Sequence, residues 1–345
     1  MRLLTVVGAR PQFVKAFPLN LECRRRGHDE VVVHTGQHFD DQMSEVFFRE
    51  LDLTAPKHHL GIAGGGHGAM TGRMLGALEP VMEVERPDVV VVLGDTNSTL
   101  AGALAAAKLD LKVVHIEAGL RSFNRAMPEE INRVVADHLS GLRLCPTRVA
   151  LRHLAAEGIT SGVAHVGDLM FDATLLARAL AERHARTVRS WALPAHGYAV
   201  ATLHRAENTA DAAILARRLA ELHESAGELP VVLPMHPRTR EAVAHFGLDT
   251  GELRLVQPLG YLDMCHLVAR AALVLTDSGG LQKEAYFHGV PCVTLRTETE
   301  WTETIEHGWN RLVDTPEWRT PRRHIDDYGD GAAAAACLDA IEAWL

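Results

Sequence analysis

The sequence predicts an α/β protein built from two Rossmann-like domains. Short β-branched runs alternate with longer Ala/Leu-rich amphipathic segments, which is typical of βα units and of parallel sheets buried on both faces. The chain has 345 residues, and single hydrophobic cores rarely grow past roughly 250 residues. Residues 89–119 and 272–300 also share one layout of strand, acid, small residues, helix and second strand. Together these observations favour two similar domains.

The predicted strands divide into two groups along the chain. We expect a first domain over residues 1–170 and a second over residues 171–330, with a closing helix at 331–345 that joins the first domain. An Arg-rich helical connection around residues 172–195 follows the last strand of the first group. The predicted strands are residues 3–8, 30–36, 88–95, 112–119, 142–146 and 163–168 in the first domain, and 198–204, 230–236, 253–258, 272–278 and 291–296 in the second.

Composition argues against several classes of function. The formal charge is −9, and no Lys/Arg block interleaves with aromatic residues, so we expect no nucleic-acid partner. The first residues do not form a signal peptide and no apolar stretch reaches membrane-spanning length, so we expect a cytoplasmic protein without a membrane partner. Five cysteines without CxxC spacing indicate reduced thiols. The histidines, although numerous, form no HExxH motif, and we expect no metal site.

The strongest phosphate signal is "VLTDSGGLQKEA", residues 274–285. Ser278, Gly279 and Gly280 stand between a buried strand and a helix, where backbone N–H groups and the helix dipole favour an anion. Glu284, one helical turn further on, could accept hydrogen bonds from ribose hydroxyls. The alternative is a plain capped βα turn with a solvated helix acid.

A second strand, turn and helix opens the chain as "VVGARPQFVKAFPL". It lacks GxGxxG, which argues against a nicotinamide cofactor. Arg10 and Lys15 instead offer cations at a strand edge, where a diphosphate could be met. The alternative is ordinary solvation of a helix start.

Two histidines also follow predicted strands. His204 ends one strand and Arg205 opens the next helix, while His236 ends another strand. A histidine at a strand end is often only a hydrogen-bonded structural residue. The carboxyl ends of strands converge in open α/β sheets, however, so we expect these side chains to lie near the Ser278 turn and near Arg10.

Three carboxylates of the first half need a common explanation. Asp95 and Glu117 end consecutive predicted strands, and the loop "MPEE" can bring Glu129 over them. Clustered acids repel one another, which raises some pKa values and suits proton transfer near neutrality. The alternative is that each acid caps a helix or pairs with Arg121, Arg125 or Arg133.

The sequence resembles the non-hydrolysing UDP-N-acetylglucosamine 2-epimerases over nearly its whole length. The shared motifs stand in the family's order and spacing: "GARPQ", "TGQH", "GDTNST", "HIEAGLRS", "MPEEINR", "LHRAEN", "PMHPRTR", "LTDSGGLQKEA", "GVPCVTLR", "GWNRLV" and "YGDG". The resemblance implies a GT-B type fold with a cleft between its domains, a homodimer, and a UDP-sugar substrate with no cofactor. It further implies acid/base roles for Asp95, Glu117 and Glu129, a leaving-group role for His204, and UDP contacts from Arg10, Lys15, Arg205, His236, Ser278, Gly279, Gly280, Glu284 and Arg311.

The implied reaction interconverts UDP-N-acetylglucosamine and UDP-N-acetylmannosamine by elimination and readdition of UDP. Alternatives are the 2-epimerase of UDP-2,3-diacetamido-2,3-dideoxyglucuronate, for which Arg73 or Arg296 would meet the uronate, a hydrolysing epimerase, and a GT-B glycosyltransferase. The chain departs from the family pattern at Gln12, where many members have Glu, and at Met264, where some have an aromatic residue. It also has "QHFDDQM" in place of the "QHR" of substrate-activated members, and a short connection before "YGDG".

Overall fold

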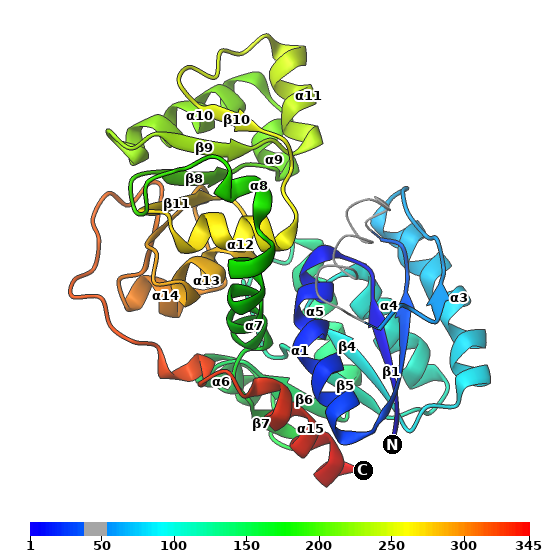
Figure 1. Cartoon of the computed structure of the whole chain (residues 1–345). Helices are drawn as coiled ribbons and strands as arrows, with labels where there is room; N and C mark the ends of the chain where they lie inside the picture. The colour runs from blue at the N-terminus through cyan, green and yellow to red at the C-terminus, as the bar shows by residue number, and fades with distance from the viewer. Residues whose placement is uncertain (38–53) are drawn as a thin grey trace. The chain divides into compact units, whose positions relative to one another are not determined.

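The computed structural model describes residues 1–37 and 54–345. The chain divides into two compact units: residues 1–175 together with 326–345 form unit 1, and residues 176–325 form unit 2. Each unit is a parallel sheet with helices packed on its faces (Figure 1). The "QHFDDQM" departure lies outside the described residues, except for Gln37.

Every strand pair of the unit 1 sheet is parallel, in the order β3-β2-β1-β4-β5-β6-β7. The order reverses between β1 and β4. All five residues of β4, "VVVVL", are buried, because helices cover both faces. The strands are β1 Arg2–Val7, β2 Asp29–His34, β3 His58–His59, β4 Val89–Leu93, β5 Val113–Ile116, β6 Leu142–Cys145 and β7 Val163–His165.

The helices of unit 1 bury apolar side chains against this sheet. One core gathers β-branched residues of β1, β2 and β4 with Met and Leu of α3 and the alanines of α4. The last helix, α15, packs on α1, where Arg26 pairs with Asp339 and Glu342. The helices are α1 Arg10–Arg26, α3 His67–Glu85, α4 Asn97–Lys108, α5 Pro128–Leu139, α6 Arg148–Ala156, the first part of α7 Leu169–His184, the 3-10 turn η1 Asp326–Tyr328 and α15 Ala333–Trp344.

Unit 2 repeats this plan with the strand order β10-β9-β8-β11-β12-β13, again parallel throughout. Here the order reverses between β8 and β11. Helices α10 and α11 cover one face of the sheet, and α8, α12 and α13 cover the other. The strands are β8 Ala199–Thr202, β9 Val231–Pro234, β10 Arg254–Val256, β11 Leu273–Thr276, β12 Cys292–Thr294 and β13 Asn310–Leu312; the helices are α8 Arg186–Arg189, α9 Ala206–Thr209, α10 Ala212–Ala226, α11 Pro237–Phe246, α12 Tyr261–Ala269, α13 Gly279–Phe287 and α14 Thr302–Glu306.

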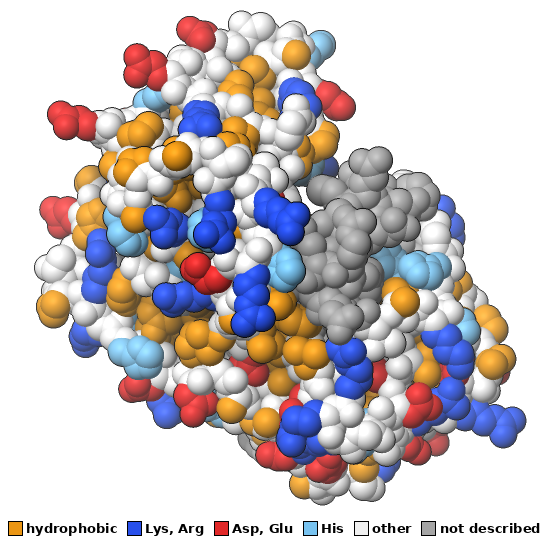
Figure 2. Space-filling view, in the orientation of Figure 1, with side chains coloured by type: hydrophobic (Ala, Val, Ile, Leu, Met, Phe, Trp, Pro, Cys, Tyr) orange, Lys and Arg blue, Asp and Glu red, His pale blue; other side chains and the backbone are white. Residues whose placement is uncertain are grey.

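The structure confirms the predicted α/β class and contains all eleven predicted strands. All eleven predicted strands extend one to three residues too far at the carboxyl end, because the chain there has already left the ladder. Strands β3 and β13 escaped prediction, since neither "HH" nor "NRL" contains a β-branched residue. Lys and Arg side chains gather on the surface around α8 and the adjoining part of α7, the segment predicted to be Arg-rich (Figure 2). No helix in the described ranges is long and apolar enough to cross a bilayer.

Two glycines of unit 1, Gly119 and Gly158, allow a matched test of how closely the turn after β5 packs on α6. Gly119 has φ +78°, and a Cβ added there would lie 2.5 Å from the carbonyl oxygen of Ala150; Gly158 has φ +81° with nothing within 4 Å. We expect Gly158→Ala to lower the free energy of unfolding by about 1 to 2 kcal/mol through backbone strain alone. Gly119→Ala should cost about 1 to 3 kcal/mol more, because the backbone of α6 must move. Urea unfolding of both variants measures the difference, and equal losses would contradict the close packing at Gly119.

Candidate active site

Several of the predicted site residues follow the strands at which each sheet reverses its order. In unit 1, Arg10 follows β1 and Asp95 follows β4; in unit 2, His204 follows β8 and Ser278 follows β11. In open α/β sheets, ligands bind outside the carboxyl ends of the strands at such a switch point, because the connecting helices there diverge to opposite faces. Each unit therefore has a candidate binding edge of its own.

Glu117 is a buried carboxylate that pairs with a buried cation. It directly follows β5, with φ +66° and 8% of its surface exposed. The Nζ atom of Lys15, on α1, forms a hydrogen-bonded ion pair with Glu117 Oε2. A Cβ on Gly94 would lie 3.0 Å from the same oxygen. A non-glycine residue at positive φ costs of order 1 to 3 kcal/mol, so the surrounding contacts hold Glu117 in a strained turn.

Asp95 lies on the neighbouring turn and is held by α5. The guanidinium of Arg133 donates to Asp95 Oδ2 over 3.0 Å from Nε and 2.7 Å from an Nη atom. Asn132 donates to the Asp95 carbonyl at 2.8 Å. Asp95 keeps 34% of its side chain exposed, so it can still reach a ligand. The alternative stated from the sequence, that Asp95 pairs with an arginine, is therefore confirmed. Asp95 also lies at the edge of the sheet, as expected.

The acidic pair at the start of α5 separates into two environments. Glu130 is buried and accepts hydrogen bonds from the backbone N–H groups of Ser122 and Phe123 and from Arg133. Burial by itself raises the pKa of Glu130, but these donors outweigh it and the pKa is lowered. Glu129 lies in the same helical turn and is only partly buried. Glu130 therefore holds the loop, while Glu129 remains available to a ligand.

Sequence reasoning missed several residues that organise this edge. Gln12 accepts from the N–H groups of Gly8 and Ala9 and donates to the Leu93 carbonyl, so it ties the β1 turn to the end of β4. A glutamate here could not donate that last bond, which explains what the amide adds in this chain. His115 and Asp137 are also buried beside these turns. Their signal was a histidine inside the apolar run "KVVHI" and an acid on the buried face of α5.

Unit 2 holds His204 through a buried aspartate. Asp277 follows β11 and is fully buried, and its Oδ1 lies 2.9 Å from His204 Nδ1. Its Oδ2 accepts from the backbone N–H groups of His204 and Arg205, each at 2.9 Å, and from Asn208. Burial raises the pKa of Asp277, but the histidine and the N–H donors outweigh it and lower the pKa to about 2. The ring of His236, which caps α11, lies 5.7 Å from that of His204, so the structure brings these two together as expected.

The Ser278 turn has the form of an anion site. Ser278 is the N-cap of α13, and Gly279 and Gly280 form the first turn, with Glu284 further along the same helix. The Ser278 N–H donates to Thr276 Oγ1 at 2.9 Å. A Cβ on Gly279 would lie 2.5 Å from Glu300 Oε1, so the side chain of Glu300 lies close to this turn. Arg205, on the neighbouring turn, lies 3.7 Å from Glu207 in an ion pair.

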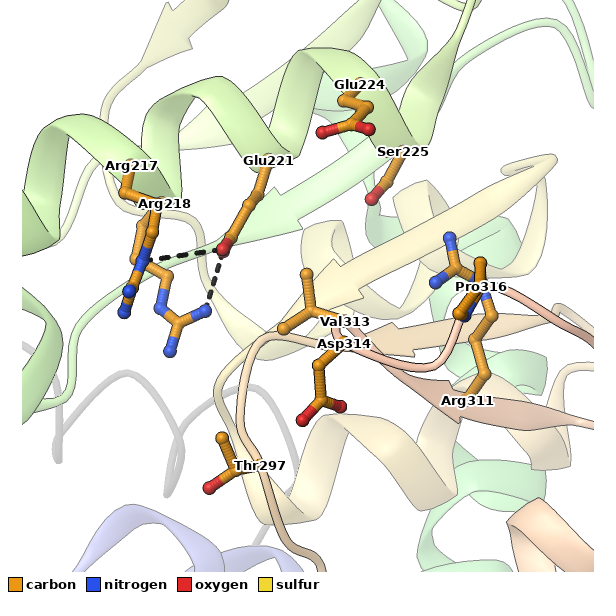
Figure 3. A pocket seen from close by; sticks show the side chains of 10 residues that line it. All are labelled: Arg217, Arg218, Glu221, Glu224, Ser225, Thr297, Arg311, Val313, Asp314 and Pro316. Carbon is orange, nitrogen blue, oxygen red and sulfur yellow. Dashed lines mark hydrogen bonds and ion pairs between the residues drawn. The ribbon is translucent and has the colours of Figure 1, made fainter.

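Arg311 lies elsewhere in unit 2. It belongs to the edge strand β13 and lines a pocket of about 390 Å³ with Arg217, Arg218 and Glu221 of α10 (Figure 3). Its guanidinium stacks on Trp318 at 5.4 Å and donates to the carbonyls of Leu312 and Thr315. None of the other predicted binding residues lines this pocket. The predicted UDP contact from Arg311 stays a prediction, since the residues that line this pocket do not include the Ser278 turn.

No group of three or more His, Cys, Asp or Glu side chains within the described ranges is arranged to hold a metal ion. The arrangement offers acids and cations at one sheet edge and an anion-binding turn with a histidine at the other. These groups suit proton transfer and binding of a charged phosphate ester.

Two parallel sheets with these switch points define a protein of the GT-B type, with two Rossmann-like units. The family model described as UDP-N-acetylglucosamine 2-epimerase matches residues 21–342. The chain therefore belongs to the UDP-N-acetylglucosamine 2-epimerase family, whose members are isomerases.

Individual relatives resemble the chain over most of its length. A UDP-N-acetylglucosamine 2-epimerase homolog of Methanococcus maripaludis is 47% identical and is matched over 91% of this chain and 88% of its own. The UDP-2,3-diacetamido-2,3-dideoxy-D-glucuronate 2-epimerase of Pseudomonas aeruginosa is 49% identical over the same shares. The crystal structure of the Methanocaldococcus jannaschii UDP-GlcNAc 2-epimerase in complex with UDP-GlcNAc and UDP is 37% identical, with a TM-score of 0.89 over 99% of this chain and 100% of that one.

The buried Asp277 predicts a pH-dependent stability. Its pKa falls from an ordinary 3.8 to about 2 on folding, so the folded state favours the ionised form. The stabilisation, about 2 kcal/mol, is present above pH 4 and is lost as the pH falls through 2. Asp277→Asn should therefore unfold more easily than the parent protein at pH 7. The difference between the two free energies of unfolding should become smaller below pH 4. Denaturant unfolding between pH 3 and pH 7 checks this; a difference that does not change with pH would contradict it.

Proposed function

We propose that this protein interconverts UDP-N-acetylglucosamine and UDP-N-acetylmannosamine without net hydrolysis. The observation that carries the proposal is the pair of acids, Asp95 and Glu117, on adjacent parallel strand ends of a chain that belongs to the 2-epimerase family. A glycosyltransferase would share the fold and the nucleotide site but has no use for two acids at this edge.

The chemistry requires such acids. The hydrogen on sugar carbon-2 is not beside a carbonyl, so its removal is unfavourable unless the bond from carbon-1 to UDP breaks as well. A carboxylate takes the proton, carbon-1 and carbon-2 form a double bond, and UDP leaves with the electron pair of the broken bond. The products are a 2-acetamidoglucal and UDP. Readdition of UDP, with a proton delivered to the opposite face of carbon-2, gives the epimer, so two acid/base groups are needed.

We assign the proton transfers to Asp95, Glu117 and Glu129. The ion pair with Lys15 supports an ionised Glu117, because a nearby cation favours the carboxylate despite burial. Arg133 pairs with Asp95. Such a carboxylate can accept a proton and also stabilise positive charge that develops on the sugar as the bond to UDP breaks.

We assign the departing UDP to unit 2. His204, His236, Arg205 and the turn of Ser278, Gly279 and Gly280 would contact the diphosphate, and Glu284 the ribose. Arg10 and Arg311 remain further proposed contacts. The support for His204 is its buried partner Asp277, which holds the ring while 39% of the side chain stays exposed. We further propose a cytoplasmic homodimer; the five buried, unpaired cysteines support a reducing compartment.

A second candidate substrate is UDP-2,3-diacetamido-2,3-dideoxyglucuronate, which the 49% identity to the Pseudomonas aeruginosa enzyme favours. The two cations expected to meet its carboxylate are both engaged. Arg296 is buried and pairs with Glu300 at 3.1 Å, and Arg73 donates to the carbonyls of Ala63 and Gly64. These pairings favour the neutral sugar.

A panel of UDP-sugars in heavy water tests the proposal. We expect deuterium on carbon-2 of both epimers of UDP-N-acetylglucosamine, because the reaction returns a solvent proton to that carbon, and a smaller rate with the uronate. Proton NMR follows exchange and product identity together. Release of free N-acetylmannosamine as the main product would indicate the hydrolysing reaction. Exchange with neither sugar would overturn the proposal.

Glu117→Gln should reduce kcat by about 100-fold or more, because it removes an acid/base group, while leaving the affinity for UDP within about threefold. Glu85→Gln is a matched control: Glu85 is also buried in unit 1 and paired with a lysine, Lys57 at 2.8 Å, but it ends α3 away from the strand ends. The control should lose stability and keep kcat. Steady-state kinetics and UDP titration measure both variants. Loss of UDP binding in Glu117→Gln would assign Glu117 to the nucleotide instead.

A further inference from the structure

We propose that His115 and Asp137 form a clamp that fixes the spacing between the two turns that carry Asp95 and Glu117. The inference rests on the proposed function, since it names positioning residues for the same proton transfers. Neither His115 nor Asp137 would touch the substrate. Both are fully buried, with 0% of either side chain exposed.

One end of the clamp holds the Asp95 turn. His115 lies in β5, and its Nε2 is 2.7 Å from the carbonyl oxygen of Gly94, the residue before Asp95. That carbonyl can only accept, so Nε2 carries a hydrogen and donates it. Gly94 also donates its N–H to the Ile116 carbonyl at 3.0 Å. The peptide that leads into Asp95 is therefore bonded on both sides to the strand that leads into Glu117.

The other end holds the Glu117 turn. Asp137 Oδ1 lies 2.7 Å from His115 Nδ1, and Oδ2 accepts from the Gly119 N–H at 3.1 Å and from Arg121 at 2.7 Å. Burial raises the pKa of Asp137, but His115 and Arg121 outweigh burial and lower it. His115 Nδ1 is the hydrogen-bond partner of Asp137 Oδ1 in this contact. The imidazole thus links Gly94, before one acid, through Asp137 to Gly119, just after the other.

The clamp holds residues that lie beyond the last paired residues of β4 and β5. Strands β4 and β5 are in register as far as Leu93 and Ile116. The next residues, Gly94 and Glu117, both have left-handed backbones, with φ +63° and +66°. Beyond the ladder, the pleat of the strands does not set where the side chains point. Bonds to Gly94 and Gly119 supply that constraint, and a misplacement of about 1 Å at a reacting group can cost 10²-fold in rate.

Two substitutions at position 115, each with a neutral amide side chain, distinguish the bond of the clamp to Gly94 from its bond to Asp137. In His115→Gln the amide nitrogen can occupy the place of Nε2 and still donate to Gly94. In His115→Asn it can occupy the place of Nδ1 and reach Asp137 but not Gly94. We expect kcat to fall about 100-fold in His115→Asn and at least tenfold less in His115→Gln, with KM and UDP affinity within about threefold in both. If His115 merely supported folding, the losses in kcat of the two variants would follow their unfolding temperatures and not this order.

Asp172→Asn is the control, because Asp172 is also a buried acid of unit 1 that accepts backbone N–H groups, those of Ala333 and Ala334, away from the carboxylate turns. It should keep kcat. Equal kcat for the two His115 variants, or a loss of UDP binding alone, would overturn the clamp.

If the His115 variants do not fold, a measurement on the unaltered protein tests the clamp. With ¹⁵N-labelled histidine, one imidazole should show a ring N–H that exchanges slowly with water, because His115 Nε2 donates to the Gly94 carbonyl from a fully buried site. Absence of such a ring would overturn the clamp, and its presence supports it. This readout does not depend on turnover. Failure of the proposed function appears separately, as a parent enzyme that puts no deuterium on carbon-2.

Discussion

All strands of both sheets are parallel, and this constraint organises the rest of the molecule. Each strand delivers its last residue to the same edge of its sheet, so polar groups far apart in sequence meet there. The reversals of strand order, at β1 and β4 and again at β8 and β11, open room between diverging helices. Acids follow β4 and β5, and a histidine and an N-terminal helix turn follow β8 and β11.

Bringing carboxylates to a buried edge has a cost that specific partners offset. An isolated buried carboxylate would take up a proton, because burial raises its pKa. In this protein two of the acids at the edge pair with cations: Glu117 with Lys15 and Asp95 with Arg133. A single arginine also joins Asp95 to Glu130, so the loop that carries Glu129 and the β4 turn are held by the same side chain.

Strand ends could be predicted from the sequence, whereas side-chain partners could not. Hydrophobic runs locate eleven strands and thereby place Asp95, Glu117, His204 and Ser278 at sheet edges. Nothing in the spacing says that Lys15, expected at a diphosphate, reaches across to Glu117, because that pairing depends on how α1 lies on the sheet. The same holds for Asp277, which the pattern shows only as the end of a strand. Glu129 and Glu130 are neighbours in sequence, and only the turn of α5 decides which of them is buried.

Both units use a buried aspartate to hold a histidine, and the difference between the two pairs explains their different roles. In unit 1, His115 has both ring nitrogens committed, one to Asp137 and one to the Gly94 carbonyl, and no exposed surface. It can only position. In unit 2, His204 meets Asp277 on one side and keeps much of its ring exposed. Asp277 lies beside the ring, at the sheet edge where we propose that a phosphate binds. We propose that the histidine supports the turns in unit 1 and contacts a phosphate in unit 2, because only His204 keeps part of its side chain exposed.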